Sequence, residues 1–346
     1  MNRYSTIKDV ARLAGTTAAT VSYVLNAREG RYISKETRQK VEEAANELDY
    51  IKCNRASSLK GKNSKLIAIL VPQFENQFFT RIIVSAQEVF VKHNYDMVIC
   101  NTWDNPEQER DIIHRMLQQR VDGILLAPTS KGAENTETLR RLGIKMVAVD
   151  RPLEGTDNIC SIATGNYESG YKGASFLFEK GHKEITFIGW KSQIADLDKR
   201  RLAVLESAKD KGIPLKNVLI KEGDFSQEEG YRLTAEVLDN NPGVTAFFYG
   251  FNVQALGGVK CLLDRGIKIP DEKSVLLIGN PEWAVSGGNN YSHISMSEND
   301  LGKGAAELLM NMLKNPENDF LINTTVSCTL VEGNSVRLIN KEERFV

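Results

Sequence analysis

The first residues whose type and spacing could do chemistry are Thr6 and Thr17, which stand where a hydroxyl can cap the start of a helix. Apolar residues follow each threonine at helical spacing, and Gly15 separates the two predicted helices. Two short helices across a glycine-containing turn are typical of a helix-turn-helix. The outward face of the second helix is small and polar, as contact with base edges in a major groove requires: Ala18, Ala19, Ser22 and Asn26, with Tyr23 at its edge. The alternative for this stretch is a simple amphipathic helical hairpin.

Charge is divided unevenly along the 346 residues, although the formal net charge is only −1. Residues 1–62 hold 12 Lys and Arg against 7 Asp and Glu, whereas the remainder holds 32 against 38. A basic N-terminal part on an acidic body is what phosphate binding by one end requires. A third helix is predicted from Ser34 to Leu48, and the polar, basic residues 51–63 are typical of a flexible linker.

From Leu66 onward, short apolar runs alternate with helical stretches, which predicts parallel sheets covered on both faces. A first unit has predicted strands at 66–71, 96–101, 123–127, 145–149 and 160–164, with helices near 79–91, 108–117 and 136–142. A second has strands at 184–190, 218–222, 246–249 and 274–278, with helices near 167–180, 197–211, 227–239 and 253–265. The tail (293–296, a helix over 298–313, and 324–332) is expected to cross back between the units. Two such lobes predict a ligand site in the cleft at the strands' carboxyl ends.

Residues 6–26 closely resemble the N-terminal motif of the lactose-repressor (LacI/GalR) family of bacterial transcription regulators, with departures at Thr17, often Ser there, and Tyr23, often Arg there. The resemblance implies an operator-binding head and, in residues 51–63, a hinge helix that inserts a leucine into the minor groove. It implies contacts with double-stranded operator DNA from Thr6, Thr16, Thr17, Ala18, Ala19, Thr20, Ser22, Tyr23 and Asn26 in the head, and from Ala56 and Leu59 in the hinge.

The resemblance extends over nearly the whole chain, carried by motifs such as Asp150-Arg151-Pro152, Gly181-His182-Lys183, Gly223-Asp224-Phe225 and Leu301-Gly302. It implies an α/β protein: a three-helix helix-turn-helix head and hinge, then a two-lobed, periplasmic-binding-protein-like core of doubly wound parallel sheets. The expected domains are the head (1–50), the hinge (51–63) and an effector-binding and dimerisation core (64–346). Within the core we expect an N-lobe of about 64–163 plus 292–323 and a C-lobe of about 164–291 plus 324–346.

The expected cleft departs from the sugar-binding members of that family, because four positions that usually carry acids do not: Gln73, Gly165, Phe251-Asn252 and Gly279-Asn280. Arg201 matches the arginine that usually reaches the ligand, and Phe74, Phe79, Trp190, Tyr249 and Trp283 offer aromatic rings. The predicted effector-binding residues are Gln73, Phe74, Phe79, Asp150, Trp190, Arg201, Phe251, Asn252 and Asn280. The ligand is expected to be a sugar, a sugar phosphate or another anionic metabolite, with anionic or aromatic ligands favoured over a neutral sugar.

Other classes of protein fit the sequence less well. The phosphate-binding glycine motifs and the nucleophile elbow of enzymes do not occur, the four histidines are isolated, and five scattered cysteines indicate neither disulfides nor a metal site. We expect no cofactor and, without a long apolar run or signal peptide, a cytoplasmic homodimer with no membrane contact. An exported solute binder would need a signal and no head. A protein co-regulator or a degenerate pocket in place of the small effector stays open. The sequence does not identify the effector or the operator. It does not indicate whether the effector induces or co-represses, or whether dimers form tetramers.

Overall fold

The computed structural model describes residues 5–25, 32–50, 63–153, 155–156, 159–286, 290–317 and 321–339. The chain divides into two compact units, Met1–Ser64 and Lys65–Val346.

The first unit contains three helices: α1 (Ile7–Leu13), α2 (Ala18–Leu25) and α3 (Lys35–Glu47). Thr6 caps α1 in a capping box with Asp9, and the amide of Thr20 donates to Thr17 Oγ1 at 3.2 Å at the start of α2. Gly15, between them, has a φ of +62°, which glycine adopts without strain. The small core is formed by Val10, Ala11, Val21, Val24, Val41 and Ala44.

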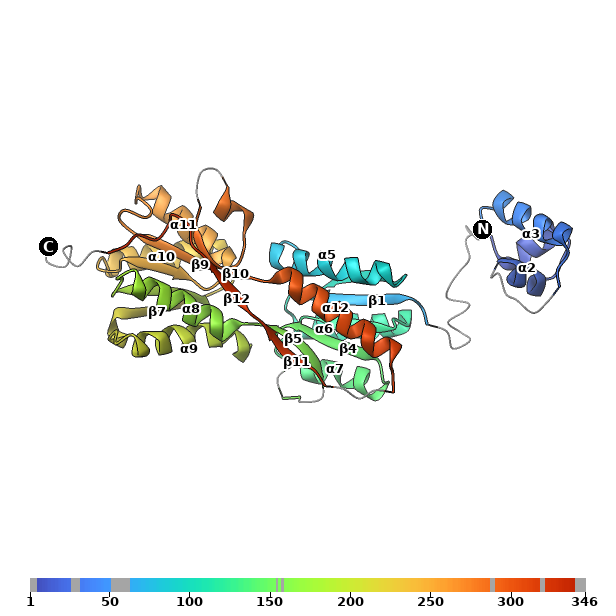
Figure 1. Ribbon diagram of the computed structural model, residues 1–346, viewed down its shortest axis with the longest axis horizontal. Coiled ribbons are helices and arrows are strands. Elements are labelled where there is room, and N and C mark those ends of the chain that lie inside the picture. The colour runs from blue at the N-terminus through green and yellow to red at the C-terminus, as the bar shows by residue number, and fades with distance from the viewer. Residues whose placement is uncertain are drawn as a thin grey trace. The chain divides into compact units, whose positions relative to one another are not determined.

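The second unit contains two six-stranded sheets, each in its own lobe (Figure 1). The first sheet has the order β11-β5-β4-β3-β1-β2 and is parallel throughout. Its strands are β1 (Leu66–Val71), β2 (Asp96–Asn101), β3 (Gly123–Leu126), β4 (Lys145–Asp150), β5 (Cys160–Thr164) and β11 (Asn323–Val326). Its helices are α5 (Gln77–Lys92), α6 (Pro106–Gln119), α7 (Gly132–Arg141) and α12 (Glu298–Lys314).

The second sheet has the order β12-β10-β9-β8-β6-β7, and only β12 runs antiparallel to its neighbour. Its strands are β6 (Ile185–Trp190), β7 (Val218–Gly223), β8 (Ala246–Tyr249), β9 (Ser274–Ile278), β10 (Ser292–Met296) and β12 (Cys328–Val331). Its helices are α8 (Asn166–Glu179), α9 (Ala195–Asp210), α10 (Gln227–Asn240) and α11 (Asn252–Asp264), with short 3-10 turns η1 (Leu215–Asn217) and η2 (Glu282–Val285).

The central strands of the two sheets are buried on both faces, as predicted. In β1, Ile67 and Ile69 pack toward α5 and α12, whereas Ala68 and Leu70 pack toward α6 and α7. In β8, Phe248 packs toward α8 and α9, and Phe247 toward α10 and α11. The bounds predicted for β1 to β9 agree with the structure to within one residue.

Strand pairing corrects the predicted limits of the lobes. β10 pairs with β9 in the second sheet, so the first lobe's late segment begins after Met296 and not at residue 292. β11 pairs with β5 in the first sheet, so residues 324–326 belong to the first lobe and not the second. The predicted strand over 324–332 is therefore two strands in different sheets, and this segment crosses between the lobes (Figure 1).

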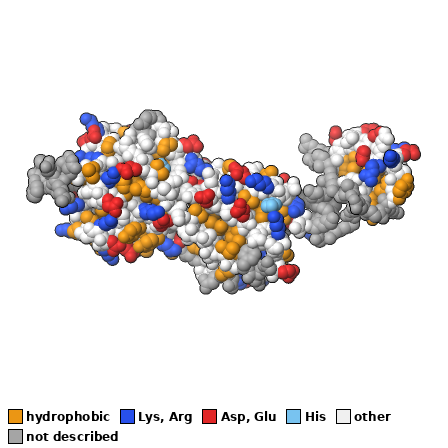
Figure 2. Space-filling model, in the orientation of Figure 1, with side chains coloured by type: hydrophobic (Ala, Val, Ile, Leu, Met, Phe, Trp, Pro, Cys, Tyr) orange, Lys and Arg blue, Asp and Glu red, His pale blue; other side chains and the backbone are white. Residues whose placement is uncertain are grey.

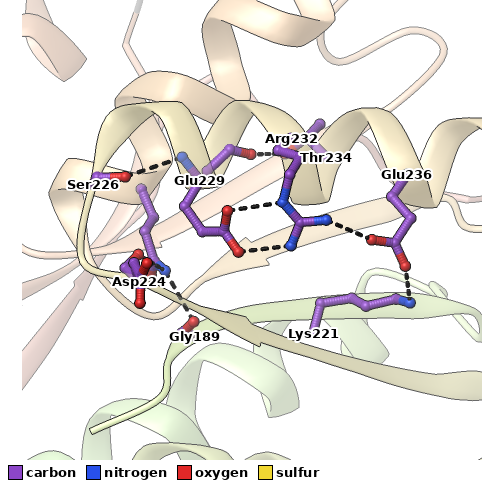
Figure 3. Close-up of polar contacts among 10 residues, drawn as sticks. Gly189, Lys221, Asp224, Ser226, Glu229, Arg232, Thr234 and Glu236 are labelled. Atoms are coloured by element: carbon purple, nitrogen blue, oxygen red, sulfur yellow. Dashed lines mark hydrogen bonds and ion pairs between the residues drawn. The ribbon is translucent and has the colours of Figure 1, made fainter.

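Charged side chains of both signs are interspersed over the visible face of the second unit (Figure 2). On α10 they form a chain of ion pairs from Glu229 through Arg232 and Glu236 to Lys221 of β7, at 2.6 to 3.1 Å (Figure 3). Ion pairs of this kind near the surface contribute little to stability individually. The main role of this series of ion pairs is to attach α10 to the edge strand β7. No helix among the described residues is long and apolar enough to span a bilayer.

The neighbouring helices of the second unit touch through glycines. A Cβ on Gly302 of α12 would lie 2.0 Å from Ser85 Oγ and 2.3 Å from the carbonyl oxygen of Ile82, both in α5. Gly257 of α11 meets the carbonyl oxygen of Gln227 at 1.8 Å in the same way. Backbone atoms cannot move aside as a flexible side chain can, so these positions exclude any larger residue.

We therefore expect Gly302→Ala to lower the free energy of unfolding by about 1–3 kcal/mol, because α12 must move off α5. Gly304→Ala in the same helix is the matched control, since its Cβ would meet only the end of the Ile162 side chain, at 3.0 Å. Urea denaturation of the two variants measures the difference. Equal stabilities would contradict the backbone contact.

His182 is fully buried, and its Nδ1 lies 2.8 Å from Thr245 Oγ1. Burial lowers the pKa of His182 to about 4, from an ordinary value of 6.5. The unfolded chain therefore binds a proton at a higher pH than the folded chain does. Stability contributed by the neutral imidazole is present above pH 6.5 and is lost as the pH falls toward 4.

We expect this histidine to remove about 3 kcal/mol of stability between pH 6.5 and pH 4, at about 1.4 kcal/mol for each pH unit. His182→Asn keeps a polar atom for Thr245 and cannot take up the proton, so its stability should fall less over this range. His114→Asn, at an exposed position of α6, is the control and should follow the unaltered protein. Identical pH profiles for all three proteins would refute the assignment.

Candidate functional site

A cleft lies between the two lobes at the carboxyl ends of the strands, with about 750 Å³ of empty space including the part open to solvent. Because parallel strands point their carboxyl ends to one edge of a sheet, loops far apart in the sequence meet there. The lining residues are Pro72, Gln73, Asn76, Gln77, Phe78, Phe79, Asp104, Asp150, Arg151, Trp190, Leu197, Arg200, Phe225, Phe251, Asn252, Ile278, Gly279, Asn280, Met296 and Glu298.

Aromatic rings line the cleft from both lobes. Trp190, Phe225 and Phe251 of the second lobe form a triangle with ring centroids 5.1 to 5.9 Å apart and tilted or edge-to-face planes. Phe78 and Phe79 of the first lobe meet edge-to-face at 5.1 Å. Rings in such arrangements hold each other in fixed orientations, so the cleft offers flat, apolar surfaces.

The triangle is held from behind by Gln254 of α11. Its Nε2 donates to the carbonyl oxygens of Gly189 at 2.9 Å and Asp224 at 3.0 Å. Figure 3 shows Gly189 and Asp224 near the start of α10. Trp190 and Phe225 follow these residues directly, so one fully buried amide fixes the ends of both loops.

Arg200 of α9 is the buried cation of the second lobe's side of the cleft. Its Nε donates to Asn166 Oδ1 at 2.7 Å, its Nη1 donates to the carbonyl oxygen of Gly250 at 2.6 Å, and its guanidinium lies 4.4 Å from the centre of the Phe251 ring. Asn166 in turn donates to Asp196 Oδ2 at 2.7 Å. Burial lowers the pKa of Arg200 to about 10, so the group is still charged at neutral pH.

The carboxylates of the cleft already have partners. Arg151 lies 3.2 Å from Asp104 and 3.6 Å from Asp150, and Thr164 Oγ1 donates to Asp150 at 2.5 Å. Burial raises the pKa of Asp150, while Arg151 opposes that rise. Asp150 also has a φ of +73°, a strained conformation of the kind that functional sites hold.

Polar contacts join the lobes across the cleft. Arg81 of α5 donates to the carbonyl oxygen of Asn280 at 2.7 Å, and Asn252 Nδ2 donates to Asn76 Oδ1 at 3.3 Å. Asn280 Nδ2 donates to Glu298 Oε2 at 2.6 Å, and burial raises the pKa of Glu298. The structure therefore has the two lobes in contact through these hydrogen bonds.

Seven of the nine predicted effector-binding residues line this cleft: Gln73, Phe79, Asp150, Trp190, Phe251, Asn252 and Asn280. Their contact with an effector stays a prediction. Phe74 is not among the lining residues, and its side chain is exposed.

The placement of Arg201 in the cleft is wrong by one residue. Arg201 pairs with Asp198 at 2.7 Å and with Glu222 at 3.7 Å, while Arg200 lines the cleft. One step along a helix turns the side chain by about 100°. The motif match could not decide between two adjacent arginines.

Two other rings suggested by the sequence also lie elsewhere. Tyr249 is fully buried, with its hydroxyl 2.9 Å from Thr234 Oγ1, and Trp283 packs against Tyr291. Phe225 was not predicted as a cleft residue, although it belongs to the Gly223-Asp224-Phe225 motif that carries the family resemblance. Arg151 was not predicted as a cleft residue either, although it follows Asp150 directly.

The predicted DNA-binding residues of the head lie on and before α2. Thr6 and Thr17 act as helix caps with exposed side chains, and Ala19 is exposed, whereas Ala18 packs partly against the core of the head. Thr16, Thr20, Ser22 and Tyr23 are partly exposed. Asn26, Ala56 and Leu59 lie outside the described residues. Contact with DNA stays a prediction for all of them.

Among the described residues, no group of three or more His, Cys, Asp or Glu side chains is placed to hold a metal ion. The cleft offers aromatic rings, amides, the guanidinium groups of Arg151 and Arg200, and carboxylates that are already paired. Such a lining can bind and orient a small molecule.

Two family profiles match the chain. Residues 6–52 match "Bacterial regulatory proteins, lacI family", and residues 64–326 match "Periplasmic binding proteins and sugar binding domain of LacI family". Among curated proteins, the HTH-type transcriptional repressor PurR of Vibrio vulnificus (strain CMCP6) is 31% identical over 319 residues, covering 91% of this chain and 94% of that protein.

Solved structures share the fold at lower identity. The Lac repressor dimer bound to operator and the anti-inducer ONPF has a TM-score of 0.82 at 23% identity, covering 97% of this chain and all of that one. A LacI family regulator from Enterococcus faecium with bound ribose has a TM-score of 0.72 at 22% identity, covering 80% of this chain and all of that one.

Profiles of one family of regulatory proteins match both units of the chain. This match favours a regulator over the two alternatives, an enzyme and an exported solute-binding protein. The second profile alone spans more than half of the sequence, and the curated relative agrees with it along almost the whole chain. The chain belongs to the lacI family of bacterial regulatory proteins.

Proposed function

We propose that this protein is a dimeric transcriptional repressor that binds operator DNA through its N-terminal unit and a small-molecule effector in the cleft between its lobes. The observation that carries the proposal is the combination in one chain of a helix-turn-helix, in which one face of α2 is partly exposed, and a two-lobed unit with a lined cleft. As a DNA-binding regulator it would act in the cytoplasm, where bacterial DNA lies.

The relatives support this function by what they are known to bind. The curated relative is a transcriptional repressor, the Lac repressor dimer was solved on its operator, and the regulator from Enterococcus faecium holds ribose. The basic N-terminal residues 1–62 favour phosphate contacts, which provide most sequence-independent affinity. Two heads in a dimer would contact two half-sites.

Regulation would follow from the connection between the lobes. An effector that contacts residues of both lobes favours one angle between them, and that angle sets the spacing of the two linkers in a dimer. A coupling of about 1–3 kcal/mol between effector and DNA is enough for useful control. Selection of bound fragments from a genomic library, with and without a panel of metabolites, tests both parts together. Absence of any enriched sequence would refute the proposal.

We expect Ala19→Glu to abolish operator binding without loss of stability. Ala19 is exposed on α2, so a carboxylate there meets no core residue but would repel the phosphates. Asn46→Glu on the exposed side of α3 adds the same charge and should retain most of the affinity. Fluorescence anisotropy with labelled operator measures both. Equal loss in the two variants would show that α2 is not the DNA-contacting helix.

We also expect Leu59→Ala to weaken operator binding and to reduce DNA bending, because Leu59 matches the family's minor-groove leucine. Inserting a side chain between base pairs is coupled to a deformation of a few kcal/mol, so its loss is measurable by titration. Thermal unfolding of the second unit should be unchanged. Unaltered affinity together with unaltered bending would remove Leu59 from the interface.

A further inference from the structure

We propose that the effector is a planar aromatic carboxylate with a hydrogen-bond donor on its ring, bound with the carboxylate at Arg200 and the ring among Trp190, Phe225 and Phe251. This inference rests on the proposed effector role of the cleft and specifies the chemical class of the ligand. It follows from three features of the cleft. Arg200 is a buried cation without an adjacent anion, the carboxylates of the cleft are already paired, and the side-chain oxygen of Asn280 is an acceptor without a donor in the described structure.

The cation is Arg200, whose side chain lies between α9 and the Phe251 ring. Its hydrogen bonds go to uncharged oxygens, and among the described residues no carboxylate lies within 4 Å of it. Asp150 and Asp196 act on it only from farther away. Its Nη2 makes no hydrogen bond to the described part of the chain. A buried guanidinium without an adjacent anion is unfavourable, so an anionic ligand would be stabilised here.

The carboxylates of the cleft explain why a neutral sugar fits less well. A sugar is held by carboxylates that accept from paired hydroxyls, but Asp104 and Asp150 are engaged by Arg151, and Glu298 by Asn280 and Arg81. Releasing any of these would leave a buried cation or amide without its partner. A ligand that brings its own negative charge needs none of them.

The remaining surface selects a flat, apolar ligand body. Leu197, Ile278 and Met296 line the cleft beside the five rings, and Gln254 holds the loops that carry Trp190 and Phe225. An aromatic ring gains stacking and edge-to-face contacts in such a site, whereas a ring covered with hydroxyls would leave them without partners.

The acceptor is Asn280. Its Nδ2 donates to Met296 O and to Glu298 Oε2, so the orientation of the amide is fixed, and its Oδ1 is buried with no donor in the described structure. A hydroxyl or amino group on the ligand's ring would supply that donor.

The test is calorimetric titration of the full-length protein with benzoate, the three hydroxybenzoates and 4-aminobenzoate. Each is paired with its uncharged amide, and ribose, glucose 6-phosphate, hypoxanthine and inorganic phosphate complete the panel. We expect one ring-substituted carboxylate to bind best, at least tenfold tighter than its own amide, because a charged hydrogen bond is lost in the amide.

Arg200→Gln should weaken that carboxylate at least tenfold, while Arg201→Gln, the matched change at the neighbouring ion-paired arginine, should leave it within twofold. If Arg200→Gln does not fold, the comparison of carboxylate with amide in the unaltered protein decides. Asn280→Leu should reduce the difference in affinity between the ring-substituted carboxylate and benzoate. This variant therefore tests the contact with the ring substituent separately from the contact of the carboxylate with Arg200.

The proposal is overturned if an amide equals its carboxylate, if Arg200→Gln binds the carboxylate normally, or if ribose, the sugar phosphate or hypoxanthine binds more tightly than every carboxylate. Absence of binding by all carboxylates below about 1 mM also overturns it. Operator binding is measured on the same samples. Selective DNA binding that responds to another ligand class leaves the proposed function standing, whereas carboxylate binding without DNA selection refutes only the proposed function.

Discussion

The arrangement of the second unit depends on the direction of its strands. In both sheets the parallel strands end at the cleft, so residues that follow β1, β4, β6, β8 and β9 lie around one cavity although they are up to about 200 positions apart. The strands must be apolar to pack helices on both faces, which leaves only their ends for polar side chains. The cleft side chains therefore come from the strand ends, from the loops that follow them and from the first turns of helices such as α5 and α9.

This separation also decides what could be predicted. A strand such as β1 is apolar at every position and bounded by polar residues, so its limits were predicted correctly. Gln73 and Asn252 were placed at the cleft because they match positions that usually carry acids in the sugar-binding members of the family, and both line it. By contrast, the sheet to which β10 belongs is decided by its pairing with β9, and the residue pattern of β10 itself does not contain that pairing. The limit between the lobes was accordingly misplaced there.

Arg200 and Arg201 show that a match to a family motif does not predict which of two adjacent side chains faces the cleft. Both are arginines in the first half of α9, and a shift of one residue exchanges a partly exposed ion pair for a buried cation at the cleft. The difference depends on the exact start of α9 and on the acceptors that happen to face it, Asn166 and Gly250. Phe74 and Phe79 also differ, since Phe74 is exposed in the segment before α5 and Phe79 is buried on α5.

The crossing between β5 and α8 brings these parts together. Thr164, the last residue of β5, holds Asp150, and Asn166, the first residue of α8, holds Arg200. Two cleft residues of opposite charge are thus attached to a crossing segment only three residues long. A ligand that changes the position of Arg200 must move Asn166 or break their hydrogen bond, and Asn166 cannot move without changing the direction in which the chain enters the second lobe. Because Asn166 also donates to Asp196, the first turn of α9 would move with it. The route from the cleft to the angle between the lobes is therefore short and polar, and it requires no rearrangement of either apolar core.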